Sequence, residues 1–171
     1  MVTHTINKEP ASSSVSDDRD ELVITRIFGA PRDRVWKAWT DPRELVKWWG
    51  PKDYTSPVCR IDLRVGGKYL FSMRSPEGRV FWSTGEYREI VDQERIVYSD
   101  SFSNENGDVV PATFYGMNED FPLCMHVVAT FAKSKGSTVM ALKHIGLPRG
   151  SMTEQTAQGW NESFDKLDES L

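Results

Sequence analysis

APRDRVWKAWTDPRELVKWWGP, residues 30–51, contains four of the six tryptophans of the chain within two short helical patterns. Pro31 suits the first position of one helix, where its missing N–H leaves no partner unsatisfied. Asp41 suits the cap of a second helix, with Glu44 three residues later as in a capping box, and Gly50-Pro51 predicts where that helix ends. We therefore expect two short helices joined at a corner, with their aromatic side chains buried against other elements.

Strand patterns flank this stretch on both sides. The β-branched run Glu21–Phe28 predicts a first strand. After the helices, apolar and polar residues alternate with the period of a strand that buries one face. This pattern occurs in segments 59–65, 69–73, 79–91, 96–102, 123–131 and 139–144.

Glycines indicate how some of these strands turn and bend. Gly66-Gly67 predicts a type I′ hairpin, because both central residues of that turn need positive φ angles. Gly85 predicts a bulge or a close backbone approach within segment 79–91, and a bulge would leave the inward face of that strand undetermined. Residues 103–122 have no clean period and predict a long loop over the sheet.

The last segment, residues 151–171, predicts a long helix. Ser151 and Glu154 have capping-box spacing at its start. Gly159 interrupts good helix formers at a cost of about 1 kcal/mol relative to alanine, which predicts the close approach of another group. A continuous apolar stripe consists of Ala157, Trp160, Phe164, Leu167 and Leu171.

This order of elements predicts an α+β fold. A curved antiparallel sheet of about seven strands surrounds one long C-terminal helix, and two short helices follow the first strand. One long helix is too small to fill the concave side of such a sheet. We therefore expect an internal apolar cavity.

Composition limits the class of protein. The chain has 171 residues, which predicts one domain over residues 21–171 preceded by a polar, disordered tail over residues 1–20. A net charge of −4 without a dense basic segment argues against nucleic acid as a partner. No segment resembles a signal peptide or is long and apolar enough for membrane insertion, so we expect a cytoplasmic protein. Cys59 and Cys124 are too few for a disulfide framework.

Several motifs together resemble one family from about Leu22 to Leu171. They are Ala30-Pro31-Arg32 with Val35-Trp36, Trp39-Thr40-Asp41-Pro42, Trp48-Trp49-Gly50-Pro51, Asp62-Leu63-Arg64-Val65-Gly66-Gly67, Gly85-Glu86-Tyr87 with Glu89-Ile90, and Gly159-Trp160. The chain resembles START-related (SRPBCC) proteins of the family named after the activator of the heat-shock-protein-90 ATPase. The resemblance implies the helix-grip fold, with a hydrophobic pocket between the sheet and the long helix. Asp100 departs from the family pattern, because relatives often carry an aromatic residue there.

The resemblance leaves the activity open. Many members bind apolar small molecules, some relatives act as cyclases or aromatase-like enzymes, and the founding domain binds a chaperone. The leading hypothesis is a non-catalytic carrier or sensor of a small hydrophobic or aromatic molecule. Its predicted ligand-binding residues are Trp39, Trp49, Tyr69, Phe71, Met73, Tyr98, Phe102, Met125, Val127, Leu142, His144, Ala157, Trp160 and Phe164.

Two alternatives belong to other functional classes. An enzyme, cyclase-like, aromatase-like or hydrolytic, would use Asp100 and His144 as its acid–base pair. A co-chaperone module would have a chaperone as its partner, on the family resemblance alone.

Two histidines on consecutive strands raise the question of a metal site. A two-residue turn at Ser134-Lys135 would place Met125 opposite His144, with His144 inward and His126 outward. The two imidazoles would then lie on opposite faces of the sheet. Because no Cys or carboxylate partner has ligand spacing either, we expect no metal and no cofactor.

Overall fold

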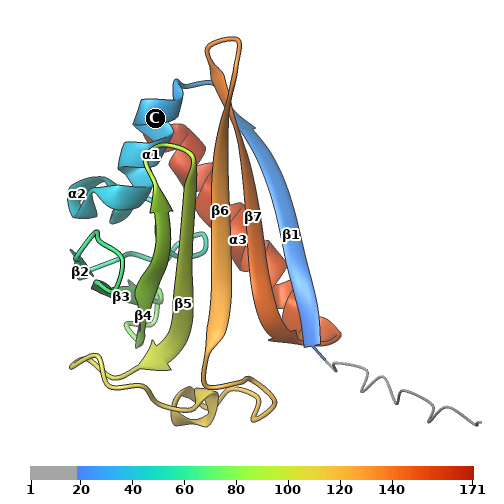
Figure 1. The fold of residues 1–171 in the computed structure, drawn as a ribbon. Coiled ribbons are helices and arrows are strands. Elements are labelled where there is room, and N and C mark those ends of the chain that lie inside the picture. Colours follow the sequence, from blue (N-terminus) through green and yellow to red (C-terminus); the bar gives the residue numbers. More distant parts are fainter. Residues whose placement is uncertain (1–18) are drawn as a thin grey trace, which may run out of the picture.

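A computed structural model describes residues 19–171 of the chain (Figure 1). The predicted disordered tail falls mainly on residues 1–18, which lie outside the described residues. The first strand starts at Arg19, two residues before the predicted start. The elements in chain order are β1 (Arg19–Phe28), α1 (Arg32–Thr40), α2 (Pro42–Leu45), β2 (Cys59–Ile61), β3 (Lys68–Arg74), β4 (Val80–Val91), β5 (Arg95–Ser103), the short 3-10 helix η1 (Ala112–Tyr115), β6 (Met125–Ser134), β7 (Ser137–Pro148) and α3 (Ser151–Ser170).

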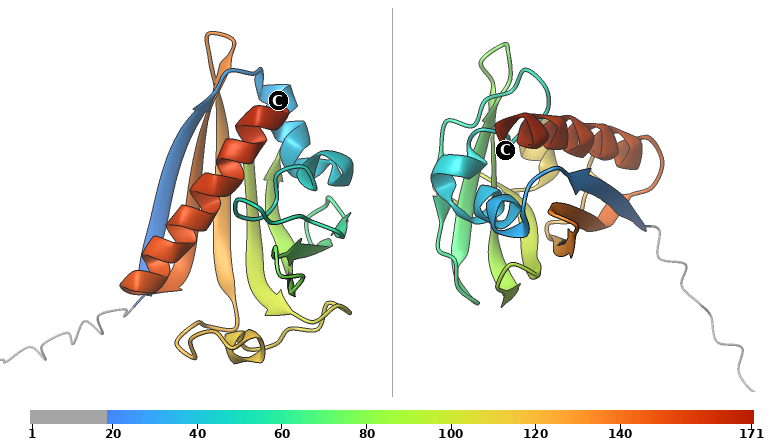
Figure 2. Two further views of the ribbon diagram at one scale, coloured as in Figure 1. Left: turned by 180° about the vertical axis from the view of Figure 1, so that it is seen from behind. Right: turned by 90° about the horizontal axis from the view of Figure 1, so that it is seen from above.

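The seven strands form one antiparallel sheet in the order β1-β7-β6-β5-β4-β3-β2. The first strand pairs with the last one, while the others follow as successive hairpins. The sheet curves, and α3 crosses its concave side diagonally (Figure 2). The C-terminal end of α3 lies beside α1, so α1 and α2 close one end of the concavity. The predicted helix-grip architecture is confirmed.

The two short helices meet at a corner, as predicted, but the second is shorter than expected. The Asp41 carboxylate accepts a hydrogen bond of 2.9 Å from the backbone N–H of Arg43 and so caps α2. The Glu44 side chain instead binds Lys47, so only half of the predicted capping box forms. Trp48 follows α2 in a turn, is fully buried, and donates its indole N–H to the carbonyl of Ala38. This bond joins the two arms of the corner.

The strand predicted over residues 59–65 is too long. Only Cys59–Ile61 pairs with β3, while the side chains of Leu63 and Val65 are 40% and 62% exposed. Gly66 has a positive φ of 83° and Gly67 does not, so the predicted type I′ hairpin is wrong. A longer loop returns the chain to β3.

The structure determines the inward face of β4. Ser83 and Tyr87 point inward with their cross-strand partners on β5, and a bulge after Tyr87 makes Ile90 the next inward residue. Gly85 makes the predicted close approach: a Cβ there would lie 1.7 Å from the carbonyl oxygen of Ser99. No other residue fits this position without moving the backbone of β5.

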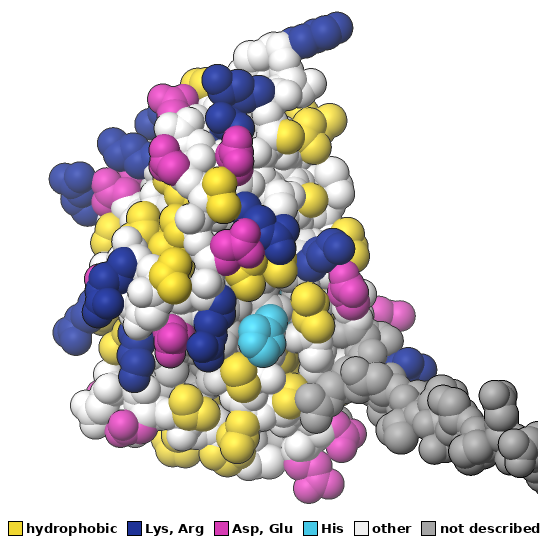
Figure 3. All heavy atoms as spheres, viewed as in Figure 1, with side chains coloured by type: hydrophobic (Ala, Val, Ile, Leu, Met, Phe, Trp, Pro, Cys, Tyr) yellow, Lys and Arg dark blue, Asp and Glu magenta, His cyan; other side chains and the backbone are white. Residues whose placement is uncertain are grey.

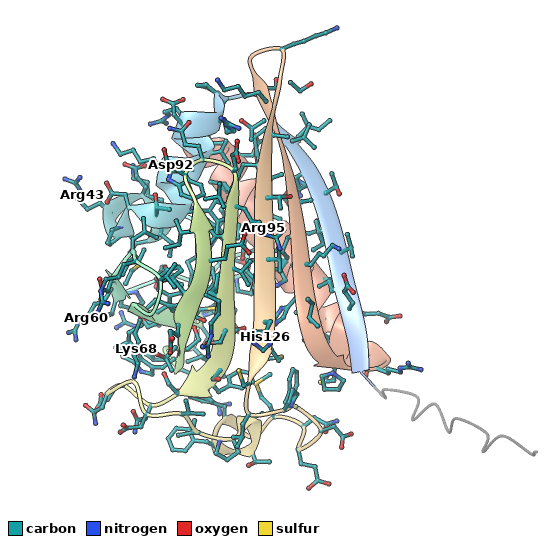
Figure 4. All side chains as sticks on the ribbon, viewed as in Figure 1. Arg43, Arg60, Lys68, Asp92, Arg95 and His126 are labelled. Atoms are coloured by element: carbon teal, nitrogen blue, oxygen red, sulfur yellow. The ribbon has the colours of Figure 1, made fainter. Side chains whose placement is uncertain are left out.

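The β6–β7 hairpin has the predicted faces with a different register. Ser134 pairs with Ser137, so Lys135 and Gly136 form the turn, and both have positive φ angles. Val127 therefore lies opposite His144, where the sequence predicts Met125. A shift of two residues preserves the faces of both strands: His144 is buried, and His126 is exposed on the outer face of β6 (Figure 4).

The start of α3 differs from the predicted capping box. Gly150 occupies the cap position and Ser151 is already helical, without a side-chain cap bond. Phe164 and Leu167 of α3 are fully buried against the sheet, and Phe164 also contacts the ring of Trp48.

The outer surface of the sheet has mixed character. On the face shown in Figure 3, Lys and Arg side chains are interspersed with acidic and hydrophobic ones. Within residues 19–171, no helix is both long and apolar enough to cross a membrane.

Candidate ligand cavity

A cavity of about 340 Å³ lies between the N-terminal half of α3 and the concave face of the sheet. Its wall is completed by residues 49–51 after α2 and by Met117 and Phe121 of the long loop before β6. These two loop side chains are half-buried, and Gln155 on α3, which also lines the cavity, is exposed, so the cavity is not sealed from the surface. The predicted long loop thus supplies part of the cavity wall.

The wall is mainly apolar and rich in flexible side chains. Four of the six methionines of the chain line it, together with four aromatic residues. Unbranched, polarizable methionine side chains adapt to guests of different shape. These residues are Met73, Met117, Met125, Met152, Trp49, Phe102, Phe121 and Trp160.

One carboxylate lies on this wall. Asp100 is on β5 between inward Tyr98 and Phe102, and its side chain is 19% exposed. The hydroxyl of Tyr69 lies 3.0 Å from both Asp100 Oδ1 and the Ser99 carbonyl oxygen and donates a shared hydrogen bond to them. The strand alternation thus places a polar group where the neighbouring inward positions are aromatic.

His144 lies beside this carboxylate. Its Nε2 is 3.4 Å from Asp100 Oδ2, and its side chain is 6% exposed. The indole N–H of Trp160 donates a hydrogen bond of 3.1 Å to His144 Nδ1. An indole nitrogen only donates, so Nδ1 carries no proton and we assign the neutral tautomer with the proton on Nε2. His144 therefore turns a neutral N–H toward Asp100 in a close contact that is not a hydrogen bond.

Burial and this carboxylate affect the neighbouring tyrosines. Burial, reinforced by the charge of Asp100, raises the pKa of Tyr69 and of Tyr98 well above the usual value. The hydroxyl of Tyr98 is buried and has no hydrogen-bond partner among the described residues. Both phenols are therefore held in the protonated form.

The structure brings only part of the predicted ligand-binding set to the cavity. Lining residues from that set are Trp49, Met73, Phe102, Met125, His144 and Trp160, and the candidate catalytic residue Asp100 joins them. Trp39, Tyr69, Phe71 and Tyr98 instead surround, with Trp49, a second void of only about 10 Å³. Val127, Leu142, Ala157 and Phe164 line neither space and pack in or against the core.

Sequence reasoning missed most of the helical wall. Met152, Thr156, Gly159 and Ser163 are spaced by four, three and four residues and share the face of α3 that lines the cavity. This spacing indicates one face of a helix, but a buried face is predicted from apolar side chains, and three of these four residues are small or polar. The other lining residues outside the predicted set are Gly50, Pro51, Ser83, Ser101, Met117, Phe121, Leu147 and Gln155.

Comparison with known proteins identifies the family. The family model described as "Activator of Hsp90 ATPase homolog 1-like protein" matches residues 29–171. The chain belongs to this family. A search of curated proteins found no match.

Solved structures of similar proteins share the fold. A Chromobacterium violaceum protein is 27% identical, with a TM-score of 0.73, and the match covers 87% of this chain and 94% of that one. A Nitrosomonas europaea protein is 25% identical, with a TM-score of 0.72 and coverage of 88% and 93%. An AHSA1 protein from Silicibacter pomeroyi is 19% identical, with a TM-score of 0.70, and the match covers 88% of this chain and 96% of that one. It shares the fold. Family membership is compatible with ligand binding or a co-chaperone-like role and names no ligand.

Proposed function

We propose that the protein binds a small apolar or aromatic molecule in this cavity and acts as a non-catalytic carrier or sensor. The observation that supports this most directly is the cavity itself. Its volume of about 340 Å³ falls in the range of about 300–1,000 Å³ that is typical of small-molecule sites. A space of this size forgoes dispersion contacts that a filled core would make, a stability cost that ligand binding would explain.

The test is uptake of an apolar fluorescent probe, N-phenyl-1-naphthylamine, by the full chain. Thr156 lines the cavity from α3, whereas Gln158 is exposed on the same helix. Thr156→Phe should lower probe affinity at least about tenfold by filling the space, and Gln158→Phe, which adds the same ring outside it, should leave affinity unchanged. Absence of probe uptake by the parent protein, or equal loss in both variants, would contradict the proposal. Native mass spectrometry of freshly purified protein would identify any ligand retained from the cell.

A second candidate function is an enzyme, favoured by the 3.4 Å contact between Asp100 and His144 on the cavity wall. In this arrangement the Trp160 N–H occupies His144 Nδ1, so only Asp100 is free to accept a proton. Turnover of a bound compound that is lost in Asp100→Asn, with binding retained, would establish catalysis. The co-chaperone role stays a prediction from the family's name, and recovery of a chaperone with the immobilised protein would test it.

A further inference from the structure

The cavity wall carries one carboxylate and no Lys or Arg side chain among the described residues. Asp100 provides this carboxylate. His144 lies beside Asp100, but its ring is neutral because Nδ1 accepts the N–H of Trp160. A carboxylate that is removed from water without a countercharge is costly, and a bound cation would offset that cost.

We propose that the ligand of this cavity carries a protonated amine on its apolar body, and that the amine binds Asp100. This inference rests on the proposed binding function and adds the chemistry of the head group. Asp100 Oδ1 already accepts from Tyr69, so Oδ2, which has only the 3.4 Å contact with His144, is the oxygen that receives the ammonium. The hydrogen bond is charge-assisted on both sides, which makes it stronger than one to a neutral donor.

The rest of the wall also favours a positively charged head group. Trp49, Trp160 and Phe102 line the cavity, and aromatic rings attract ammonium groups by cation–π interaction. An anionic head group would find no cation among the lining residues and would face the carboxylate of Asp100. Fatty acids and other carboxylates are therefore the disfavoured class.

The loop that contributes Met117 and Phe121 to the cavity wall adds negative potential. Residues 104–124 include Glu105, Asp108, Glu119 and Asp120 and contain no Lys or Arg. Arg79, just before β4, contacts this loop by donating to the carbonyl of Tyr115. The loop's own charge is −4, and a cationic ligand that approaches the cavity is attracted by it.

The experiment compares three ligands with one apolar body: 1-naphthylmethylamine, 1-naphthylmethanol and 1-naphthoic acid, each competing with N-phenyl-1-naphthylamine at pH 7. We expect affinity to fall from amine to alcohol to acid, with at least about tenfold between amine and acid. Asp100→Asn should weaken amine binding about tenfold or more and change alcohol binding by less than about threefold. Glu119→Gln, which removes one loop charge outside the cavity wall, should change amine affinity less than about twofold.

The outcomes separate this inference from the proposed function. Probe binding with the acid or the alcohol as the tightest competitor would overturn the amine assignment and leave the carrier function standing. An Asp100→Asn variant that binds the probe as the parent does and keeps the full amine preference would also overturn the amine assignment alone. Absence of probe binding by the parent would overturn the carrier function and the amine assignment with it. A thermal melt of Asp100→Asn distinguishes loss of binding from loss of fold.

Discussion

Trp160 donates its indole N–H to His144 Nδ1 at 3.1 Å, so a polar bond at the cavity wall links the long helix α3 to strand β7. His144 is 5% exposed, and its other ring nitrogen has no hydrogen-bond partner among the described residues. The bond thus satisfies one of the two ring nitrogens in a site that water hardly reaches. It also fixes the tautomer that faces Asp100.

Replacing this donor should cost stability. Trp160→Phe leaves His144 Nδ1 buried without a donor, and we expect it to lower the free energy of unfolding by about 1–3 kcal/mol beyond the loss of ring volume. Trp49→Phe is the matched control, because the Trp49 indole nitrogen is buried without a partner and no bond is lost there. Urea denaturation of both variants measures the difference. An equal or larger loss in Trp49→Phe would show that the Trp160–His144 bond contributes nothing.

High pH should unfold the protein through its buried tyrosines. Burial raises the pKa of Tyr69, Tyr87 and Tyr98 above the usual value of about 10. The unfolded chain therefore loses these protons first as pH rises, and it binds fewer protons than the folded chain. Stability is fully present below about pH 10 and then falls by up to about 1.4 kcal/mol per pH unit for each tyrosine.

Lys166 has the opposite effect on how stability changes with pH. Burial lowers the pKa of Lys166, whose ammonium donates to the carbonyls of Pro51 and Tyr54. The folded chain releases that proton first, so this contribution rises with pH and is complete near the unfolded value of about 10.5. Three tyrosines outweigh it above pH 10. Tyrosinate absorbance and circular dichroism should therefore change together above pH 10, and gradual ionisation with the fold intact would contradict this expectation.

For β6 and β7 the sequence predicts the buried face of each strand better than it predicts their register. Alternation identifies the inward residues of β6 and β7 whatever the turn, which is why His144 is placed inward correctly. The register depends on which two residues turn. The sequence predicts a turn at Ser134-Lys135, whereas the structure has it at Lys135-Gly136, where both residues have positive φ angles. Each residue of β6 therefore lies opposite a residue of β7 that is two positions away from the predicted one.

The cavity could be inferred from the order of elements, but its position along the sheet could not. An inward residue such as Val127 or Leu142 lies in the packed core, whereas inward Met125 lines the cavity on the same sheet face. Whether an inward residue is in the core or on the cavity wall depends on where α3 crosses its strand. No local pattern encodes that crossing, because it results from packing between distant segments.

The β6–β7 turn offers a gain in stability. Lys135 has a φ of 48°, a left-handed conformation that costs a residue with a side chain about 1 kcal/mol or more. Asparagine tolerates this region and suits the first position of a type I′ turn before Gly136, so Lys135→Asn should add about 0.5–1 kcal/mol. Gly136→Ala, at a φ of 81°, should instead destabilise. Thermal denaturation checks both signs, and probe binding should be unchanged because neither residue lines the cavity.

Two glycines, one in α3 and one in β4, should respond oppositely to alanine. The sequence predicts that Gly159 permits a close approach, but a Cβ there would meet only Pro51 Cγ, at an ordinary contact distance of 3.6 Å. Since alanine is about 1 kcal/mol more favourable than glycine inside a helix, Gly159→Ala should raise the free energy of unfolding by up to that amount. Gly85→Ala should prevent folding, because its Cβ would overlap the carbonyl of Ser99.

The position of Gly159 on the cavity wall explains why the helix would retain it. The methyl group of an alanine at this position would stabilise α3 but would also take up space at the cavity wall that a ligand could use. We expect Gly159→Ala to be more stable to urea than the parent and to bind N-phenyl-1-naphthylamine with unchanged or weaker affinity. Gly159→Leu, which adds a larger side chain at the same position, should bind it at least about tenfold more weakly. Destabilisation by Gly159→Ala would mean that the close approach predicted from the sequence does exist, and unimpaired probe binding by Gly159→Leu would mean that the probe binds elsewhere.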